Sequence, residues 1–420
     1  MKKYKLLDVF VPGGIPEHTY VTRQQRRLEE QIGAANDQLC KLVTVTGVTK
    51  SGKTVLTNRV YPRSQNIWVD AGAVRTEDDL WSFVLHGLGG STEVSSESRK
   101  ESEIGIEGHL GGEGSVPFVA KAGAGIGASH SATRGTSQVS KLTLSPRSAA
   151  VLTLRNRHIP IIIDDFHYLD RELQGSVVRA LKQLVLEGLP VILIAIPHRR
   201  YDAVKVEQEI TGRLEEVSVP AWEPEELLEI AEKGFRLLNV RPHAGVCERL
   251  AEESFGSPHL MQEFCRELAR RHGISETSPQ SRDIENVSHD LFVEVAKSTG
   301  KVIYDKLARG PRARKDRIQR GLKNGKTADI YQVVLLAMAH LKPGLTTIDY
   351  EALRQSIRDI LADNIPTVQE VARVLEKMAE IAATDEASAH VLDWEREERR
   401  LHIADPFFAF YLRWGVEAEV

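Results

Sequence analysis

The sequence predicts an α/β fold in its first half and an all-α region in its second half. Up to about residue 220, short β-branched apolar runs alternate with segments of helical composition, which indicates a parallel sheet covered on both faces. Beyond that point the strand pattern fades and amphipathic helical segments follow one another. The end of the chain gives three helical segments and then two candidate strands, HVLDWER and RRLHIAD.

Composition describes a globular chain and excludes several function classes. At 420 residues, and with roughly 100 to 200 residues per domain, two or three domains are expected. The net charge of −4 predicts no strong overall attraction to nucleic acid or to an anionic membrane, so such a site would be a local patch. The three cysteines are too few and too scattered for a disulfide framework or a CxxC metal site. No segment is apolar for long enough to span a membrane, and a reducing cytoplasmic location is expected.

The elements of the first half follow in a regular order. A helix is expected at 23–33 and another at 76–89, where Thr76 is a candidate N-cap. A third helix, RELQGSVVRALKQLVLEG, is expected between two strands. The expected strands are LCKLVTVTGV, NIWVDAG (66–72), IPIIIDD (159–165), LPVILIAIP (189–197) and a last core strand after TGR at 211–213.

The second half divides into three parts. Three successive helices at 221–274 predict a small helical lid. Residues 275–326 are predicted to be a basic, all-α linker, in which 306–326 carry nine Lys or Arg against one Asp. Residues 327–420 are predicted to be a winged-helix domain, from helices TADIYQVVLLAMAHL, IDYEALRQSIRDIL and TVQEVARVLEKMAEIA followed by the two-stranded wing.

A phosphate-binding motif follows the first core strand. It matches GxxxxGK[ST] without a gap and consists of Gly47, Val48, Thr49, Lys50, Ser51, Gly52, Lys53 and Thr54. The glycines let backbone N–H groups wrap an anion, and the following helix adds its positive N-terminus. Lys53 would reach the β- and γ-phosphates, and Thr54 would offer a hydroxyl to Mg²⁺. A chance GK-containing turn is the alternative, and the order of strand, loop and helix argues against it.

Two adjacent carboxylates end the apolar run IIIDD, about 110 residues after the motif. Asp164 stands where a second magnesium-organising carboxylate belongs, and Asp165 stands where a water-activating carboxylate would act. For Asp165 the alternative is a structural one, a helix cap or an ion pair.

With these motifs the chain resembles AAA+ and STAND-type P-loop ATPases, especially the archaeal-type ATPases and the origin-initiator branch. The resemblance covers nearly everything except residues 95–145, and the ending LHIADPFFAFYLRWG follows a pattern recurrent among the archaeal-type proteins. It implies a P-loop parallel-sheet ATPase core of the α/β class at 1–220, a helical lid, an all-α linker and a winged-helix domain. It also implies ATP and Mg²⁺ as cofactors.

The chain departs from the motor members of this family in several places. Motors usually carry Asp-Glu where this chain has Asp164 and Asp165, and STAND switches often carry Asp-Asp. A shorter carboxylate holds the attacking water less well, so slow hydrolysis is expected. The polar sensor of the next strand would fall at Pro197 and His198, and His198 is the candidate.

Three further residues take roles from the resemblance. Arg213 precedes the last core strand, from which such families project an arginine finger into the neighbouring subunit, which makes the active form an oligomer. Its alternative is a surface ion pair with Glu215 or Glu216. In GSPHLM, Pro258 would lie near the nucleotide and His259 would stand where motors place a sensor arginine. Gly-Ser-Pro is also an ordinary helix start.

A glycine-rich insertion interrupts the core at about 95–145. In residues 102–128 apolar side chains fall on even positions around LGGEGS, which suggests a β-hairpin. Three interpretations remain open: a loop for subunit or partner contact, a disordered spacer, and a hairpin that enters a membrane or lines a pore. Low hydrophobicity disfavours the last.

Two functions of different classes follow. The first is an ATP-binding, slowly hydrolysing switch that forms homo-oligomers and acts on DNA or on a protein partner encoded nearby, in antiviral defence, transposition or replication control. The second is a non-catalytic adaptor, stabilised by nucleotide, whose winged helix binds DNA. The basic run 306–326 favours DNA, whereas the mixed charges of the helix TVQEVARVLEKMAEIA favour protein contact.

Overall fold

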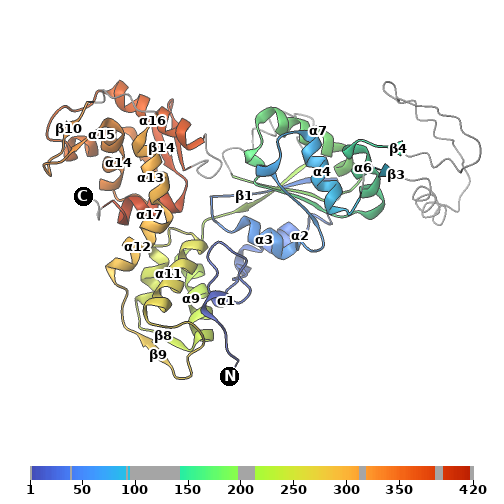
Figure 1. Ribbon diagram of the computed structural model, residues 1–420, viewed down its shortest axis with the longest axis horizontal. Helices are drawn as coiled ribbons and strands as arrows, with labels where there is room; N and C mark the ends of the chain where they lie inside the picture. Colours follow the sequence, from blue (N-terminus) through green and yellow to red (C-terminus); the bar gives the residue numbers. More distant parts are fainter. Residues whose placement is uncertain are drawn as a thin grey trace, which may run out of the picture.

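The computed structural model describes residues 2–37, 40–90, 93–94, 142–196, 213–311, 318–383 and 391–416. These residues form two lobes, a sheet with flanking helices and a larger, mainly helical lobe (Figure 1). The α/β fold class predicted for the first half is confirmed, because the sheet is parallel and carries helices on both faces.

Five parallel strands make the central sheet, in the order β2-β5-β6-β1-β7. They are β1 (Leu42–Gly47), β2 (Ile67–Asp70), β5 (Ile161–Asp164), β6 (Val191–Ala195) and β7 (Leu214–Val219). Successive side chains of a strand point to opposite faces. Ile161 and Ile163 accordingly pack in one core and Ile162 packs in the other. Strand β6 lies between the strand that leads into the phosphate loop and the strand that ends in Asp164.

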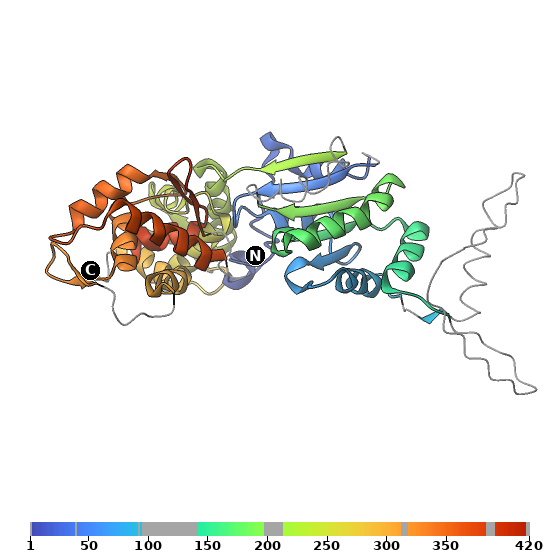
Figure 2. The ribbon, with the colours of Figure 1, turned by 90° about the horizontal axis from the view of Figure 1, so that it is seen from above.

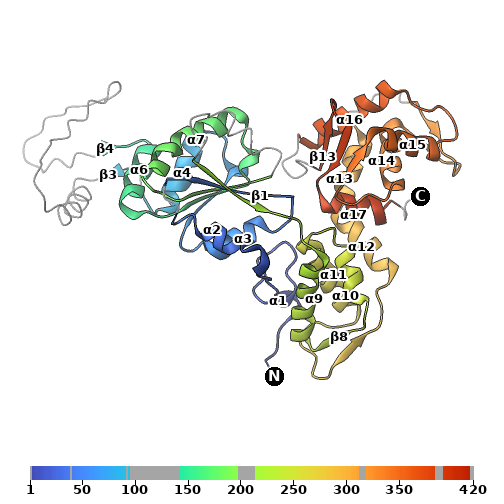
Figure 3. The same cartoon turned by 180° about the vertical axis from the view of Figure 1, so that it is seen from behind.

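Helices cover the two faces of this sheet unequally. One face carries α4 (Glu77–Gly87), α6 (Pro146–Arg157) and α7 (Arg171–Leu186), and the other carries α2 (Leu28–Gly33) and α3 (Lys53–Val60), as Figures 1 and 3 show. Thr76 caps α4 as predicted and forms a capping box with Asp79. Viewed from above, the strands run side by side, and the green helix α7 runs along them in nearly the same direction (Figure 2).

Two elements of the first half differ from the sequence prediction. The helix expected at 23–33 is broken, because Arg27 takes a left-handed backbone with φ 51° between a short 3-10 turn at Gln24–Arg26 and α2. Helix α6 was not predicted. The ends of the insertion meet in an antiparallel pair of short strands, β3 (Glu93–Val94) and β4 (Leu142–Thr143). The hairpin predicted for 102–128 lies outside the described residues.

The second lobe begins with the lid. Its helices are α9 (Pro224–Leu238), α10 (Val246–Glu252) and α11 (Pro258–Arg271), close to the three expected segments. The N-terminal helix α1 (Leu6–Val9) packs against it, and the parallel strands β8 (Val240–Pro242) and β9 (Arg282–Ile284) close its far end. Two helices, α12 (His289–Thr299) and α13 (Lys301–Arg309), occupy much of the predicted linker.

We call residues 327–416 the C-terminal unit. It contains α14 (Ile330–His340), α15 (Tyr350–Ile360), α16 (Val368–Ala383) and α17 (Pro406–Trp414). Its three-stranded antiparallel sheet has the order β12-β14-β13, with β12 (Thr347–Asp349), β13 (Leu392–Glu395) and β14 (Arg400–Ile403). A small ladder of β10 (Arg320–Gly321) and β11 (Thr327–Ala328) precedes α14. Strand β12 was not predicted, and the assignment to the winged-helix class stays a prediction.

One hydrophobic core runs through the whole second lobe. It includes Leu6 and Leu260 as well as Leu335 and Phe410, so it continues across residues 274 and 326, where the sequence placed domain boundaries. Polar contacts also join the lid to the last helix, because Glu253 accepts a hydrogen bond from Trp414 at 2.7 Å. The lid, α12, α13 and the C-terminal unit therefore pack as one lobe.

Candidate nucleotide-binding site

The phosphate loop joins β1 to α3 at the carboxyl edge of the sheet. Two of its glycines are required by its shape. A Cβ placed on Gly47 would lie 2.4 Å from the carbonyl oxygen of Val219, and Gly52 has φ +89°, a left-handed conformation that side chains rarely adopt. The loop of residues 47–54 therefore has the close backbone approach and the helix N-terminus that an anion site needs.

Lys53 is buried and is folded back onto its own loop. Its Nζ donates hydrogen bonds to the carbonyl oxygens of Gly47 and Val48, both at 2.9 Å. Burial lowers the pKa of Lys53 to about 8, although the nearby carboxylates of Asp165 and Asp164 oppose the shift. An anion in the loop would offer this ammonium a stronger partner than two neutral carbonyls.

Thr54 and Asp164 meet although they are 110 residues apart. The Thr54 hydroxyl donates to Asp164 Oδ1 at 3.1 Å, and the backbone N–H of Asp165 donates to the same oxygen at 3.1 Å. Arg63 lies 3.5 Å from Asp164 Oδ2, and its guanidinium lies over the Trp68 ring. Burial raises the pKa of Asp164, while the Thr54 hydrogen bond and Arg63 lower it. Sequence reasoning missed Arg63.

Asp165 follows the strand in a left-handed backbone with φ 53°. It lines the same cavity as the phosphate loop. Burial, and then the adjacent carboxylate of Asp164, raise its pKa to about 6, and Lys53 opposes the shift. Since Asp165 caps only a three-residue 3-10 turn and makes no side-chain cap hydrogen bond there, the capping alternative has no support in the geometry.

The donor atoms near Thr54 suit a magnesium ion. Mg²⁺ prefers oxygen ligands, and proteins usually supply one or two carboxylates while phosphates and water complete the shell. The hydroxyl of Thr54 and the carboxylate of Asp164 lie side by side in this way. Within the described part of the chain no group of three or more metal-ligating side chains occurs, so the remaining ligands would come from nucleotide and water.

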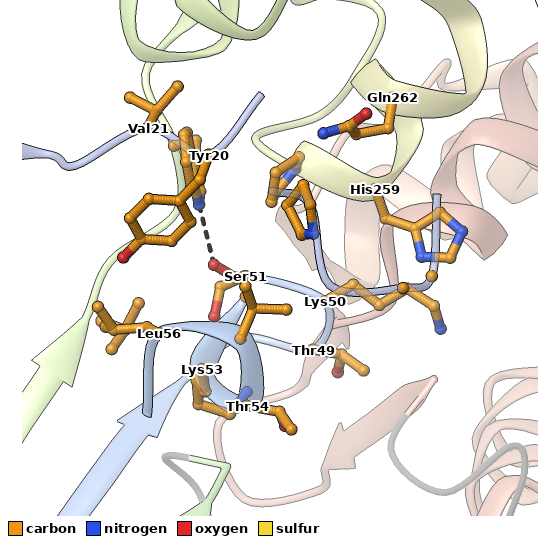
Figure 4. Close-up of a pocket in the computed structure, with 18 of the residues that line it drawn as sticks. Tyr20, Val21, Thr49, Lys50, Ser51, Lys53, Thr54, Leu56, His259 and Gln262 are labelled. Carbon is orange, nitrogen blue, oxygen red and sulfur yellow. Dashed lines mark hydrogen bonds between the residues drawn. The ribbon is translucent and has the colours of Figure 1, made fainter. Parts of the chain in front are cut away.

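A cavity of about 330 Å³ extends from the loop toward the lid. Its lining includes residues that sequence reasoning missed, among them Tyr20, Val21, Trp222 and Ile230. Figure 4 labels Tyr20 and Val21 beside the phosphate loop. The Trp222 indole donates to the carbonyl oxygen of Ser51 at 2.9 Å, which ties the start of the lid to the phosphate loop. No sequence motif predicts this part of the lining, because an N-terminal loop and the segment that connects β7 to the lid form it together.

Arg23 holds that crossing in place. It is buried and donates to the carbonyl oxygens of Pro220 and Ala221, each at 3.0 Å. It also forms an ion pair of 2.7 Å with Glu226, and its guanidinium lies 4.9 Å from the centre of the Trp222 ring.

Pro258 and His259 both line the cavity. Pro258 is the first residue of α11 and follows the N-cap Ser257, as expected for an ordinary helix start. The same residue also lies near the phosphate loop, so the two interpretations do not exclude each other. The His259 ring packs edge-on against the Phe407 ring, with 4.8 Å between the two ring centres. Burial, with Lys50 and Arg266 nearby, lowers the pKa of His259 to about 4. A neutral imidazole does not supply the charge of a sensor arginine.

Arg213 lies outside this cavity. It is exposed and precedes β7 at the amino edge of the sheet, whereas the phosphate loop is at the carboxyl edge. Glu215 pairs instead with Lys41 at 2.6 Å, and Glu216 accepts from Thr46 at 2.8 Å. Any contact of Arg213 with nucleotide would therefore be made in another subunit. Pro197 and His198 lie outside the described residues.

The parallel sheet and the phosphate loop match the α/β fold of P-loop proteins. Among solved structures, the chain is similar to the Walker-type ATPase of Pyrococcus abyssi, with TM-score 0.55, 15% identity and coverage of 97% of this chain and 99% of that one. This likeness concerns the fold, and it confirms the expected resemblance to P-loop ATPases at that level.

Weaker likenesses connect the chain with two further archaeal proteins. One is the ORC2 protein of Aeropyrum pernix, with TM-score 0.46, 14% identity and 98% and 96% of the two chains covered. The other is Cdc6p of Pyrobaculum aerophilum, with TM-score 0.43, 10% identity and 98% of each chain covered. At these TM-scores they carry no argument about this chain. No protein-family model and no curated protein matches the sequence.

Proposed function

We propose that the protein is an ATP-binding and slowly hydrolysing switch that forms homo-oligomers and acts on a partner through its second lobe. One observation carries the proposal. Lys53, Thr54, Asp164 and Asp165 converge beside a glycine loop, at the mouth of a cavity of about 330 Å³.

Each residue then has a defined task. The loop N–H groups and Lys53 hold the phosphates, and Thr54 and Asp164 hold the magnesium ion. When bound, Mg²⁺ would neutralise charge on the β- and γ-phosphates. Asp165 orients the attacking water and accepts its proton, for which a pKa of about 6 is suited near neutral pH. Tyr20, Val21 and Trp222, which line the same cavity, would enclose the base.

Two features support slow turnover. The aspartate at 165 reaches less far toward a water than a glutamate would. The neutral His259 adds no positive charge to the transition state, which is the contribution that a sensor or finger arginine makes. Arg213 would supply that charge from a neighbouring subunit, so hydrolysis would depend on assembly.

The charges of the second lobe favour a protein partner over DNA. In the basic run, Arg320 is buried, donates to the carbonyl oxygen of Asn364 and pairs with Glu370. On α16, Lys377 pairs with Glu380. Paired cations add little to binding of a phosphate backbone. Residues 312–317, the centre of the basic run, lie outside the described part of the chain, as does most of the glycine-rich insertion.

The test is a comparison of ATP binding and turnover in the wild type and in Lys53→Ala. Removing the ammonium should weaken ATP affinity by about two orders of magnitude and abolish magnesium-dependent phosphate release. Lys41→Ala, which removes a partly exposed lysine that precedes β1, pairs with Glu215 and does not line the cavity, is the matched control. Nucleotide bound without any turnover would favour the adaptor alternative, and phosphate release by Lys53→Ala at the wild-type rate would refute the proposal.

A further inference from the structure

Lys50, inside the phosphate loop, contacts the C-terminal unit directly. Its Nζ lies 3.1 Å from Asp405 Oδ2 and 4.1 Å from the centre of the Phe407 ring. This ion pair joins residues that are 355 positions apart. The Asp405 side chain is 5% exposed, so its charge is largely removed from water and Lys50 is its cationic partner. The loop that would hold phosphate is thus also a contact between the two lobes.

The two residues that contact the Lys50 ammonium, Asp405 and Phe407, are themselves held in place by several contacts. Asp405 caps α17 and accepts hydrogen bonds from the backbone N–H groups of Phe407 and Phe408 at 2.8 and 2.9 Å. Phe407 packs on His259 of α11, and His259 in turn closes on the backbone at Gly13, where an added Cβ would lie 3.0 Å from the ring. Two helices and the N-terminal segment therefore fix the position of the ammonium.

The backbone of Lys50 is strained in this arrangement. Its φ is +60°, in the left-handed region, which costs a non-glycine residue about 1 kcal/mol. Such strain persists where surrounding contacts hold it. Figure 4 shows the Lys50 side chain directed away from Lys53 and Thr54 and lying below His259. Lys50 nevertheless interacts electrostatically with both Lys53 and Asp165, so it lies within range of a bound polyphosphate.

We propose that Asp405 and Phe407 form a clamp that withholds Lys50 from the phosphates, so that nucleotide and the C-terminal unit compete for one ammonium. The inference rests on the proposed nucleotide binding at this loop. A polyphosphate carries more negative charge than one carboxylate, so it draws Lys50 away and loosens the clamp. By linkage, releasing the clamp raises nucleotide affinity by the same factor. Asp405 is in this sense a positioning residue, which acts on the nucleotide through Lys50.

The informative variant is Asp405→Asn. Asparagine is as good a helix cap as aspartate, so the variant keeps α17 and removes only the charge. It should bind a slowly hydrolysed ATP analogue about three- to tenfold more tightly than the wild type. Asp329→Asn is the matched control, because Asp329 caps α14 in the same C-terminal unit, through the N–H groups of Tyr331 and Gln332, and does not contact the loop.

A double-mutant cycle makes the test specific. In a Lys50→Met background there is no ammonium to release, so adding Asp405→Asn should leave nucleotide affinity unchanged. Hydrogen exchange gives a second readout, since nucleotide should speed exchange at the amides of Phe407 and Phe408 in the wild type.

Tighter binding in Asp405→Asn, lost in the Lys50→Met background, supports the clamp. Unchanged or weaker binding in a folded Asp405→Asn protein overturns it. If the wild type binds no nucleotide, or binds it as well as Lys53→Ala does, the proposed function fails instead.

Discussion

Asp165 has a backbone conformation that aspartate tolerates, but its surroundings disfavour its negative charge. Aspartate and asparagine are among the few side chains that tolerate a left-handed backbone, so φ 53° costs this residue little. Burial and Asp164 make its ionised form unfavourable in the nucleotide-free protein. A group whose pKa is raised on folding contributes most stability below its unfolded pKa, and that contribution is lost as pH rises through about 6.

Asp165→Asn should therefore separate catalysis from stability. Above pH 6 the nucleotide-free variant should be more stable than the wild type by about 1 to 2 kcal/mol, because the unfavourable charge is gone. It should also bind ATP and fail to hydrolyse it, since the amide does not accept a proton. Denaturant unfolding and phosphate release measure the two effects.

The control for this variant is Asp170→Asn, which changes the exposed N-cap of α7 and should alter neither quantity. Normal turnover in Asp165→Asn would show that Asp165 is not the catalytic base and has a structural role instead. Asp165→Glu should keep or raise turnover, because the longer carboxylate reaches further toward the attacking water. It places a longer side chain in the left-handed backbone and should therefore unfold more easily.

Lys53 predicts a pH dependence of nucleotide affinity. In the free protein its pKa is about 8, and only the protonated form attracts phosphate. ATP affinity should fall only about twofold between pH 7 and 8 and then more steeply, approaching about tenfold per pH unit above pH 9, where binding takes up close to one proton. Calorimetry in buffers of different ionisation enthalpy measures that uptake. An affinity that stays flat to pH 9.5, with no proton uptake, would contradict the assignment.

At the scale of elements, the crossing from β7 into α9 determines how the lid meets the loop. Trp222→Phe keeps most of the ring and deletes the N–H that bonds to Ser51 at 2.9 Å. One such hydrogen bond contributes about 0.5 to 1.5 kcal/mol, so ATP affinity should fall about two- to twelvefold. Trp414→Phe is the matched control, because it deletes a 2.7 Å bond to Glu253 in the same lobe without touching the loop. Equal effects of the two variants would mean that Trp222 acts only through stability.

The core elements were predictable because local signals determine them. The β-branched run before Gly47 is β1, and IIIDD is a strand tip whose carboxylate meets Thr54. Trp222 and Asp405 could not be found in the same way. Trp222 reaches the loop across 171 positions and Asp405 across 355, so no local pattern records either contact. Asp405 precedes a proline in the ending LHIADPFFAFYLRWG and caps α17, but its contact with Lys50 depends on how the two lobes meet.

At the scale of the whole molecule, Arg213 defines a test of assembly. Arg213→Ala should retain ATP binding and lose most hydrolysis, because in the proposed assembly the arginine would act on the site of another subunit. Lys53→Ala has the complementary defect, with an intact arginine and a defective loop. Mixing the two inactive proteins should restore part of the turnover, in proportion to the mixed assemblies, which are measured by co-purification with an affinity tag carried by only one of the two variants.

Arg241→Ala, an exposed arginine of the lid, is the control for that experiment and should turn over normally. No recovery on mixing, in assemblies shown to contain both variants, would leave Arg213 as an ordinary surface residue.

The single core shared by the lid and the C-terminal unit has a mechanical consequence. Since the core that contains Leu6 and Val416 continues without a break at the lid boundary, we expect the second lobe to move as one rigid lever. The pivot of that movement would be the short segment 220–222, to which Arg23 donates two hydrogen bonds. The phosphate loop lies beside this segment, because Trp222 bonds to Ser51. A displacement of an ångström or so at Lys50 would therefore be magnified at α16, on the far arm, where a partner would register it.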